Sequence, residues 1–246
     1  MKQEDSASYK TKKAFYDRVL TVYGRKPALE ALRDKDLQCH ILHLANSNRS
    51  GGIIAELTAA ALARDIPVRE HSREALSRIS RIGKQDQGVA LDILCPAFRS
   101  LQTYLVHLAD LPRQRVLALD GISNPQNLGM ILRSASAGRI DAVLWSRTGN
   151  AALGPLLIKP SAGPLDRAPL ALCDSPAAAL RTLAERGFGV CSLEADASES
   201  LFTHKPAGNA AFVLGNETAG VSREVSKLAD TALSIPMNNG VESLNV

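Results

Sequence analysis

The feature that most constrains this chain of 246 residues is the alternation of short apolar runs with helical segments over residues 115–193. Strands that alternate with helices need crossover connections, and these connections produce a parallel sheet. The first run, residues 115–119, is almost continuously apolar, as expected for a strand buried on both faces. The sequence therefore predicts an α/β fold, with helices at 127–137, 151–161 and 176–186 and strands at 115–119, 142–145, 169–173 and 189–193.

Two further apolar runs, residues 211–214 and 232–235, each end in a polar loop that contains glycine. Gly215, Asn216 and Glu217 follow the first run, and Pro236 follows the second. Ligands of parallel sheets bind beyond the carboxyl ends of the strands, and glycine lets a loop turn sharply near a ligand. We therefore expect two adjacent binding loops, although either loop alone is also compatible with an ordinary turn.

The loop after the first predicted strand reads DGISNPQNLGMILR and lacks the G-x-G-x-x-G of dinucleotide sites. Asn127 is placed to cap the next helix, whose free N–H groups and positive dipole end favour a phosphate. Arg133 lies about 9 Å further along that helix, and Gly129 on the same face leaves its approach open. The pattern predicts an RNA site. The alternative is a plain cap at Asn127 and an ion pair between Arg133 and Asp141.

Three motifs, in this order, resemble the signatures of the SpoU (TrmH) branch of the SPOUT RNA ribose 2′-O-methyltransferases. They are N-x-G-x-x-x-R at 127–133, G-N-E-x-x-G at 215–220, and I-P-M followed by S-L-N-V at 235–246. The resemblance implies a SPOUT-type parallel sheet with a C-terminal trefoil knot, S-adenosylmethionine as cofactor, and a homodimer. Family members continue into a further helix after the third motif, so that C-terminal helix is expected to be missing from a chain that stops at Val246.

The resemblance also implies which residues form the site. Those that would hold the cofactor, largely through backbone hydrogen bonds, are Leu214, Gly215, Asn216, Ile235, Met237 and Leu244. Those that would surround the reacting ribose, as the catalytic group, are Arg133, Asn127, Glu217, Ser243 and Asn245. Arg133 would stabilise the developing alkoxide or hold the adjacent phosphate as proton acceptor, and Glu217 would organise its loop. The apolar residues at 128 and 130–132 surround Arg133 with more apolar surface than one sheet contact needs, so they are also expected to lie near the two-fold interface of the implied homodimer.

Residues 22–95 carry a smaller α/β pattern, with helices expected at 24–32, 53–63 and 73–79 and strands at 39–44, 66–69 and 88–94. Y-G-R-K-P-A-L-E-A-L and Q-G-V-A resemble, more loosely, the L30e-like substrate-binding domain that precedes the catalytic domain of many SpoU enzymes. The implied organisation is a flexible tail at 1–21 with a short helix near 13–20, an L30e-like RNA-binding domain at 22–95, a linker at 96–113 and a methyltransferase domain at 114–246. Asp86 stands where that family usually has a histidine.

The formal net charge of +4 lies entirely in residues 1–110, because residues 111–246 carry equal numbers of acidic and basic side chains. A basic surface outside the catalytic domain suits the phosphate backbone of RNA, although it is equally compatible with an ordinary solvated surface. The candidates for phosphate contacts, each of which could also be a plain surface charge, are Arg25, Lys26, Arg49, Arg78, Arg81 and Lys84.

Composition narrows the remaining possibilities. No apolar run approaches the roughly 18 to 20 residues of a membrane span, and the polar N-terminus has no signal-peptide core, so we expect a cytoplasmic protein. Cys39, Cys95, Cys173 and Cys191 lack metal-site spacing and are predicted to be buried thiols, with no bound metal.

The predicted function is S-adenosylmethionine-dependent 2′-O-methylation of a ribose in structured RNA. Ribosomal RNA is favoured over tRNA because the SpoU enzymes with an L30e-like front domain often act there. A tRNA ribose methyltransferase, a non-catalytic RNA-binding protein and an unrelated α/β enzyme with a phosphate-binding helix are the alternatives.

Overall fold

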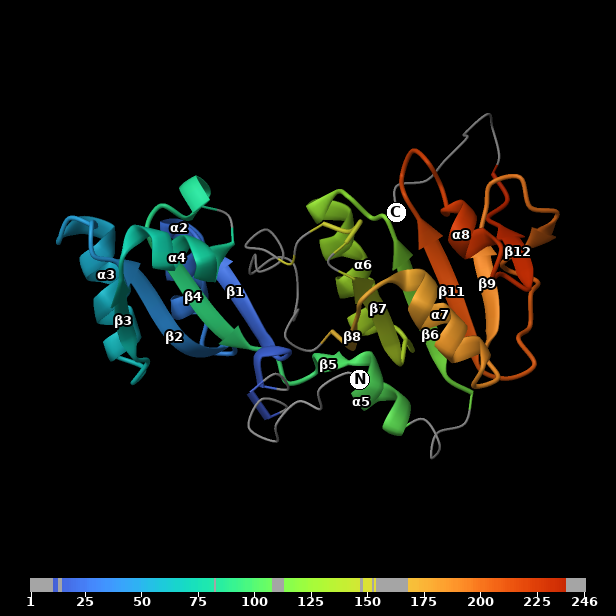
Figure 1. Ribbon diagram of the computed structural model, residues 1–246, viewed down its shortest axis with the longest axis horizontal. Coiled ribbons are helices and arrows are strands. Elements are labelled where there is room, and N and C mark those ends of the chain that lie inside the picture. The colour runs from blue at the N-terminus through green and yellow to red at the C-terminus, as the bar shows by residue number, and fades with distance from the viewer. Residues whose placement is uncertain are drawn as a thin grey trace, which may run out of the picture. The chain divides into compact units, whose positions relative to one another are not determined.

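The computed structural model describes residues 11–12, 15–81, 83–107, 113–146, 148–151, 153 and 168–237 (Figure 1). The described residues form two compact units. The first holds the described residues up to Pro96 together with Leu153, and the second holds those of 97–151 and 168–237. Each unit has its own sheet and is described by itself.

The N-terminal unit is a four-stranded mixed sheet with strand order β1-β4-β2-β3. β4 is antiparallel to both β1 and β2, while β2 and β3 are parallel. Its elements are β1 (Val19–Tyr23), α2 (Arg25–Arg33), β2 (Gln38–Ala45), α3 (Gly52–Leu62), β3 (Val68–His71), α4 (Arg73–Ser80), the short 3-10 helix η1 (Gly83–Asp86) and β4 (Val89–Leu94). The predicted α/β pattern of this segment is confirmed.

The central position of β4 follows from its sequence, VALDIL, whose first five residues are all buried. Both α2 and α4 pack against it. Helix α4 begins where the sequence predicts, because the Ser72 hydroxyl caps it by accepting a hydrogen bond from the N–H of Ala75. The buried central strand therefore forms the core on which α2 and α4 pack.

The N-terminal boundary of this unit differs from the prediction. Residues 11–12 and 15–16 are helical, but strand β1 begins at Val19, inside the segment expected to be a tail. Leu20 and Val22 are buried, and Val19 pairs with Leu94. The strand was missed because its alternating burial occupies only five residues among many polar neighbours.

The C-terminal unit is an eight-stranded sheet with strand order β10-β12-β9-β11-β6-β7-β8-β5. Every strand pairing in it is parallel, as predicted. Its elements are β5 (Arg99–Ser100), α5 (Leu101–Val106), β6 (Arg115–Asp120), α6 (Pro125–Ala137), β7 (Ala142–Ser146), β8 (Leu170–Cys173), α7 (Pro176–Ala184), β9 (Gly189–Leu193), β10 (Glu199–Ser200), β11 (Ala210–Gly215), α8 (Arg223–Ser226) and β12 (Thr231–Ser234).

Both faces of this sheet are covered. Val116 and Ala118 of β6 share one core with α5, α7 and α8, and Figure 1 shows α7 crossing β6 and β11. Leu119 points to the opposite face, because successive side chains of a strand alternate, and it is also fully buried. Two-sided burial explains why the strands of this unit are nearly continuous apolar runs.

Three expectations for this unit need comment. The strands that end at Gly215 and before Pro236 are not neighbours, because β9 lies between β11 and β12. Residues 96–113 were predicted to be a linker, and they include β5 and α5, which belong to the C-terminal unit. Residues 151 and 153 are described and are not helical, while the rest of the helix predicted at 151–161 lies outside the described residues. Residues 238–246, which were predicted to complete a knot, also lie outside them, and the knot remains a prediction.

The four cysteines are free thiols, as predicted. Cys95 and Cys191 are buried, whereas Cys39 and Cys173 are only partly so. Burial, and to a smaller extent the charge of Asp174, raise the pKa of Cys173 to about 12. Within the described residues, no cluster of three or more His, Cys, Asp or Glu side chains could hold a metal ion, and no helix is long and apolar enough to cross a bilayer.

Candidate active site and RNA interface

The candidate active site lies at the carboxyl edge of the C-terminal sheet, where the loops after β6 and β11 meet. Gly215 of β11 pairs in register with Asp120 of β6, so the two loops leave the sheet at the same level. The Asn216 side chain joins them, because its Nδ2 donates to the carbonyl oxygen of Gly121 at 2.7 Å. Its Oδ1 accepts two backbone N–H groups further along its own loop, each at 3.0 Å. One amide therefore fixes both loops.

Close packing requires glycine at position 215. The backbones of Asn216 and Gly220 hydrogen-bond to each other in both directions, at 2.8 and 2.9 Å, which folds the loop back on its own start. A Cβ atom at Gly215 would overlap the backbone of Gly220 and Val221. The first residue of the G-N-E-x-x-G motif is thus needed for the loop to close.

Asn127 and Glu217 connect the first helix of the site to this loop. Asn127 Nδ2 donates to Glu217 Oε1 at 2.9 Å, and Asn127 is only 4% exposed. The prediction that Asn127 caps the helix is wrong. Asn124 is the N-cap of α6, its side chain accepting the N–H of Gln126, and Pro125 occupies the first turn. Asn127 is therefore a helical residue with its side chain committed to Glu217.

The Glu217 carboxylate is held as a hydrogen-bond acceptor. Desolvation raises its pKa, but hydrogen bonds from its own N–H, from Asn127 and from the N–H groups of Asn124 and Ser123 lower it, and the net pKa lies below the ordinary value. A general base works best with a pKa near the operating pH. Glu217 is therefore suited to organising the loop rather than to taking a proton.

Arg133 lies on the exposed side of α6, six residues and about 9 Å beyond Asn127. Its apolar neighbours do not form an apolar surface around it, because Leu128, Ile131 and Leu132 are buried in the core of their own unit. Met130 alone of this group is exposed, at 44%. The argument from apolar excess for a two-fold interface is therefore wrong, since that surface is used inside the chain.

Two further side chains, Asn150 and Asp120, support these loops. Asn150, in the loop after β7, accepts the N–H of Ile122 at 2.8 Å and donates to the carbonyl oxygen of Leu119 at 3.1 Å. Asp120 accepts the N–H of Ser222 at 2.7 Å, which connects the end of β6 to the start of α8. The only signal in the sequence is their place just after apolar strands, and many loop residues share it.

The residues predicted to hold the cofactor come from both sides of β9. Leu214, Gly215 and Asn216 lie at the end of β11, while Ile235 and Met237 follow β12. Leu244, together with Ser243 and Asn245, lies outside the described residues. The chain thus brings the described members to one edge of the sheet, with the end of β9 between them.

In the N-terminal unit, Arg25 has a structural role that the sequence did not predict. Its Nε donates to the carbonyl oxygen of Gln87 at 3.1 Å, and one terminal nitrogen donates to Asn48 Oδ1 at 3.2 Å. Asn48 in turn donates to the carbonyl oxygen of Gly88 at 2.7 Å. Arg25 therefore ties together the loops after β1, after β2 and before β4.

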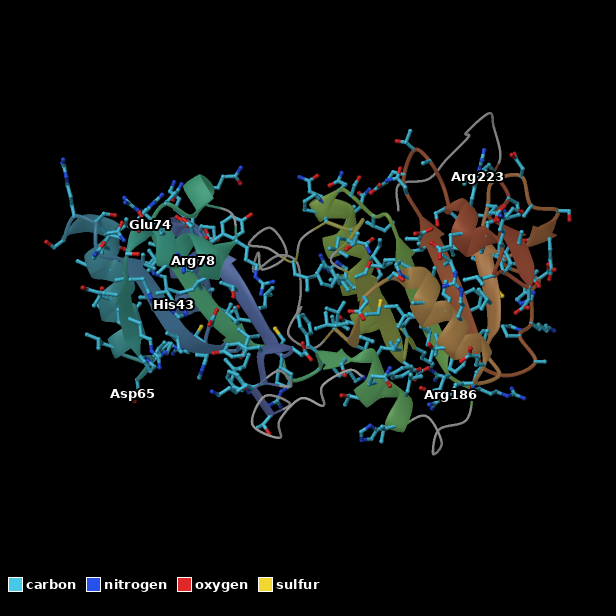
Figure 2. All side chains as sticks on the ribbon, in the orientation of Figure 1. His43, Asp65, Glu74, Arg78, Arg186 and Arg223 are labelled. Atoms are coloured by element: carbon cyan, nitrogen blue, oxygen red, sulfur yellow. The ribbon has the colours of Figure 1, made fainter. Side chains whose placement is uncertain are left out.

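The other candidate RNA contacts on this unit are exposed. Lys26 and Arg49 lie beside the loops that Arg25 joins, and Arg81 ends α4 in a left-handed conformation. Figure 2 shows Arg78 on α4, where it is also exposed. The Lys84 side chain lies outside the described part of the structure. These residues offer charge to a polyanion without disturbing a core.

Asp86, at the position where a histidine was expected, is fully buried. Its oxygens accept the Ser80 hydroxyl at 2.7 Å and the N–H of Gly88 at 2.9 Å, and Arg73 lies 3.4 Å away. The carboxylate is thus a paired internal support of the loop before β4.

Family models of known proteins match both parts of this chain. A family model described as the SpoU rRNA Methylase family matches residues 114–246, and a model for RNA 2′-O ribose methyltransferase substrate binding matches residues 21–94. A protein named uncharacterized tRNA/rRNA methyltransferase from Mycobacterium ulcerans is 31% identical over 229 residues, which cover 93% of this chain and 73% of that protein. The chain belongs to the SpoU family of RNA methyltransferases.

Other SpoU relatives and solved structures are similar over most of the chain. A protein of the same name from Mycolicibacterium vanbaalenii is 33% identical over 225 residues, which cover 91% of this chain and 71% of that protein. A TrmH-family structure from Porphyromonas gingivalis has a TM-score of 0.57 at 25% identity, covering 98% of this chain and 88% of that one. The SpoU methyltransferase AviRb from Streptomyces viridochromogenes, solved with AdoMet, has the same fold, with a TM-score of 0.59 at 18% identity and the same coverage of both chains.

The closed G-N-E-x-x-G loop gives a direct prediction. Gly215→Ala places a methyl group against backbone atoms that cannot move without breaking the Asn216–Gly220 hydrogen bonds. We expect a loss of about 2 to 4 kcal/mol in the free energy of unfolding, measured by urea denaturation. Gly208→Ala, which has open space around it, is the matched control and should cost less than about 1 kcal/mol. Equal stability of the two variants would contradict the packing at Gly215.

Proposed function

We propose that this SpoU methyltransferase methylates the 2′-hydroxyl of a ribose in structured RNA, with ribosomal RNA as its substrate class. The observation that carries the proposal is the linked pair Asn127–Glu217, which connects the exposed Arg133 helix to the G-N-E-x-x-G loop. A site with an arginine on one side and a cofactor loop on the other suits a phosphate-linked ribose better than a small neutral substrate.

The described residues fit S-adenosylmethionine, which supplies an electrophilic methyl group on sulfur when bound. Leu214, Gly215, Ile235 and Met237 lie at or just beyond the ends of two parallel strands, where backbone N–H and C=O groups can read a flat polar base, and Asn216 keeps the loop beside them closed. Leu244 would complete the set. The trefoil knot belongs to the same proposal, as the arrangement that would bring Leu244 beside the other five.

Within this site the chain must make a weak nucleophile reactive. An arginine side chain stays protonated in proteins, so Arg133 acts as a fixed positive charge and not as a base. It stabilises the oxygen as its proton leaves, or holds the neighbouring phosphate as the group that accepts the proton. Asn127 and Glu217 keep the helix and loop in register, and Ser243 and Asn245 orient the hydroxyl.

The N-terminal unit is proposed to bind the RNA, and the C-terminal unit, which includes β5 and α5, is proposed to carry out the methyl transfer. Lys26, Arg49 and Arg81 are exposed, and Lys84 follows Arg81 by three residues in the sequence. Arg25 contributes by holding the recognition loops together. The working protein is a homodimer in the cytoplasm.

Mapping of 2′-O-methyl groups tests the substrate class. Total RNA from cells with and without the gene should differ at a position in ribosomal RNA and at none in tRNA. Loss of a methyl group from tRNA, with ribosomal RNA unchanged, would contradict a ribosomal substrate and indicate a tRNA substrate instead.

Removing the charge of Arg133 should affect catalysis alone. We expect Arg133→Ala to lower the rate of methyl transfer at least about 100-fold, because the charge acts mainly as the alkoxide develops. Cofactor affinity by calorimetry should stay within about twofold, and Arg139→Ala, an exposed arginine just beyond the same helix, should leave both quantities unchanged. A parallel loss of cofactor affinity would place Arg133 in the cofactor pocket instead.

Basic residues of the N-terminal unit should contribute through phosphate contacts. Replacing Lys26, Arg49 and Arg81 together by Gln should weaken RNA binding and reduce the slope of log K against log salt by about 2, since each phosphate contact contributes about 0.7 to 0.9. Arg33→Gln is the control, because Arg33 pairs with Glu56 at 2.9 Å on the surface of the same unit. An unchanged slope for the triple variant would remove these residues from the interface.

A further inference from the structure

A pocket of about 450 Å³ lies at the carboxyl edge of the C-terminal sheet, beside the G-N-E-x-x-G loop. The loop after β9, the second half of the β11 loop and helix α8 surround it, and Figure 2 shows Arg223 at this end of the unit. The lining residues are Leu193, Glu194, Ala195, Ala219, Gly220, Val221, Arg223, Ser226 and Lys227. None of the three family motifs contains Glu194.

The strand order gives Glu194 a central place. β9 lies between β11 and β12, and the N–H of Glu194 donates to the carbonyl oxygen of Leu233 in β12 at 2.9 Å. The loop after β11 and the loop after β12 therefore flank the residues that end β9. A single ligand that touches both loops must pass over Leu193, Glu194 and Ala195.

The carboxylate of Glu194 is fixed and only half satisfied. Its Oε1 accepts the hydroxyl of Ser192 at 2.7 Å and that of Ser226 at 3.1 Å. Ser192 is completely buried, so it anchors the side chain from beneath. The second oxygen, Oε2, has no hydrogen-bond partner among the residues that the structure describes. A fixed carboxylate on a pocket wall with a free acceptor atom is prepared to bind a donor.

The other charges of the pocket indicate which donor. Arg223 and Lys227 also line it, so the wall is net positive and disfavours an ammonium or sulfonium group next to Glu194. A neutral vicinal diol meets no such repulsion and offers hydroxyl donors to an ionised carboxylate. Acidic side chains near strand ends hold ribose hydroxyls in the same way in dinucleotide-binding α/β sheets.

We propose that Glu194 is a cofactor-binding residue that accepts hydrogen bonds from the ribose 2′- and 3′-hydroxyl groups of S-adenosylmethionine. The proposal rests on the proposed function, because it assumes that both flanking loops bind the cofactor. Ser192 and Ser226 are then positioning residues that orient the carboxylate.

Calorimetry on the full chain tests this with S-adenosylhomocysteine and its 2′,3′-dideoxy analogue as probes. Glu194→Ala should weaken binding of S-adenosylhomocysteine about tenfold or more, as expected for hydrogen bonds to a charged group. The same substitution should change binding of the dideoxy analogue less than about twofold, because the partner hydroxyls are already gone. Glu194→Gln, which keeps the size of the side chain, should follow Glu194→Ala in direction and guards against a folding defect.

Glu224→Gln is the matched control, since Glu224 lies on α8 outside the pocket lining and pairs with Arg181 at 2.7 Å. It should leave both affinities unchanged. An equal loss for both probes in the Glu194 variants, or no loss for either, would overturn the assignment.

A third probe, 5′-methylthioadenosine, keeps the diol and lacks the amino-acid end. Disappearance of the Glu194 effect with this probe would show that the carboxylate contacts the ammonium group, which would also overturn the assignment. A wild-type chain that binds none of the three probes would contradict the cofactor site itself.

Discussion

The site depends on the carboxamide of Asn216. Its Nδ2 donates to the carbonyl oxygen of Gly121 in the loop after β6, and its Oδ1 accepts two N–H groups of its own loop. All three hydrogen bonds are therefore made at the carboxyl edge of the sheet. They can form because β6 and β11 are parallel neighbours whose last residues, Asp120 and Gly215, lie in register. A shift of one residue in that pairing would move the amide away from Gly121 and separate α6 from the G-N-E-x-x-G loop.

Much of this arrangement could be predicted from the sequence, because it depends on local patterns. Nearly continuous apolar runs predict parallel strands buried on both faces, and all the pairings of the C-terminal sheet are parallel. The order of the strands could not be predicted. The position of β9 between β11 and β12 is set by tertiary packing, and no residue in the two flanking strands indicates it. The position of Glu194 between the two flanking loops could not be predicted for the same reason, since it follows only from that order.

The misassigned helix cap has a different cause. Asn124 and Asn127 are both good capping residues, and the resemblance drew attention to Asn127. Pro125 carried the deciding signal, because proline favours the first turn of a helix and so makes the residue before it the cap. The sequence likewise predicts for Arg25 only a phosphate contact or a plain surface charge, although its donors hold three loops together. Basic residues can support a recognition surface from within as well as contact the polyanion directly.

The most direct test of the central claim is the chemical position of the transferred methyl group. The chain is incubated with ribosomal RNA and S-adenosylmethionine carrying a labelled methyl group, and the product is hydrolysed with alkali, which needs a free 2′-hydroxyl to cleave the backbone. We predict that the label appears in an alkali-resistant dinucleotide and that Arg133→Ala abolishes it. Label recovered in single nucleotides would mean that a base is methylated, and would contradict a site built around a ribose hydroxyl.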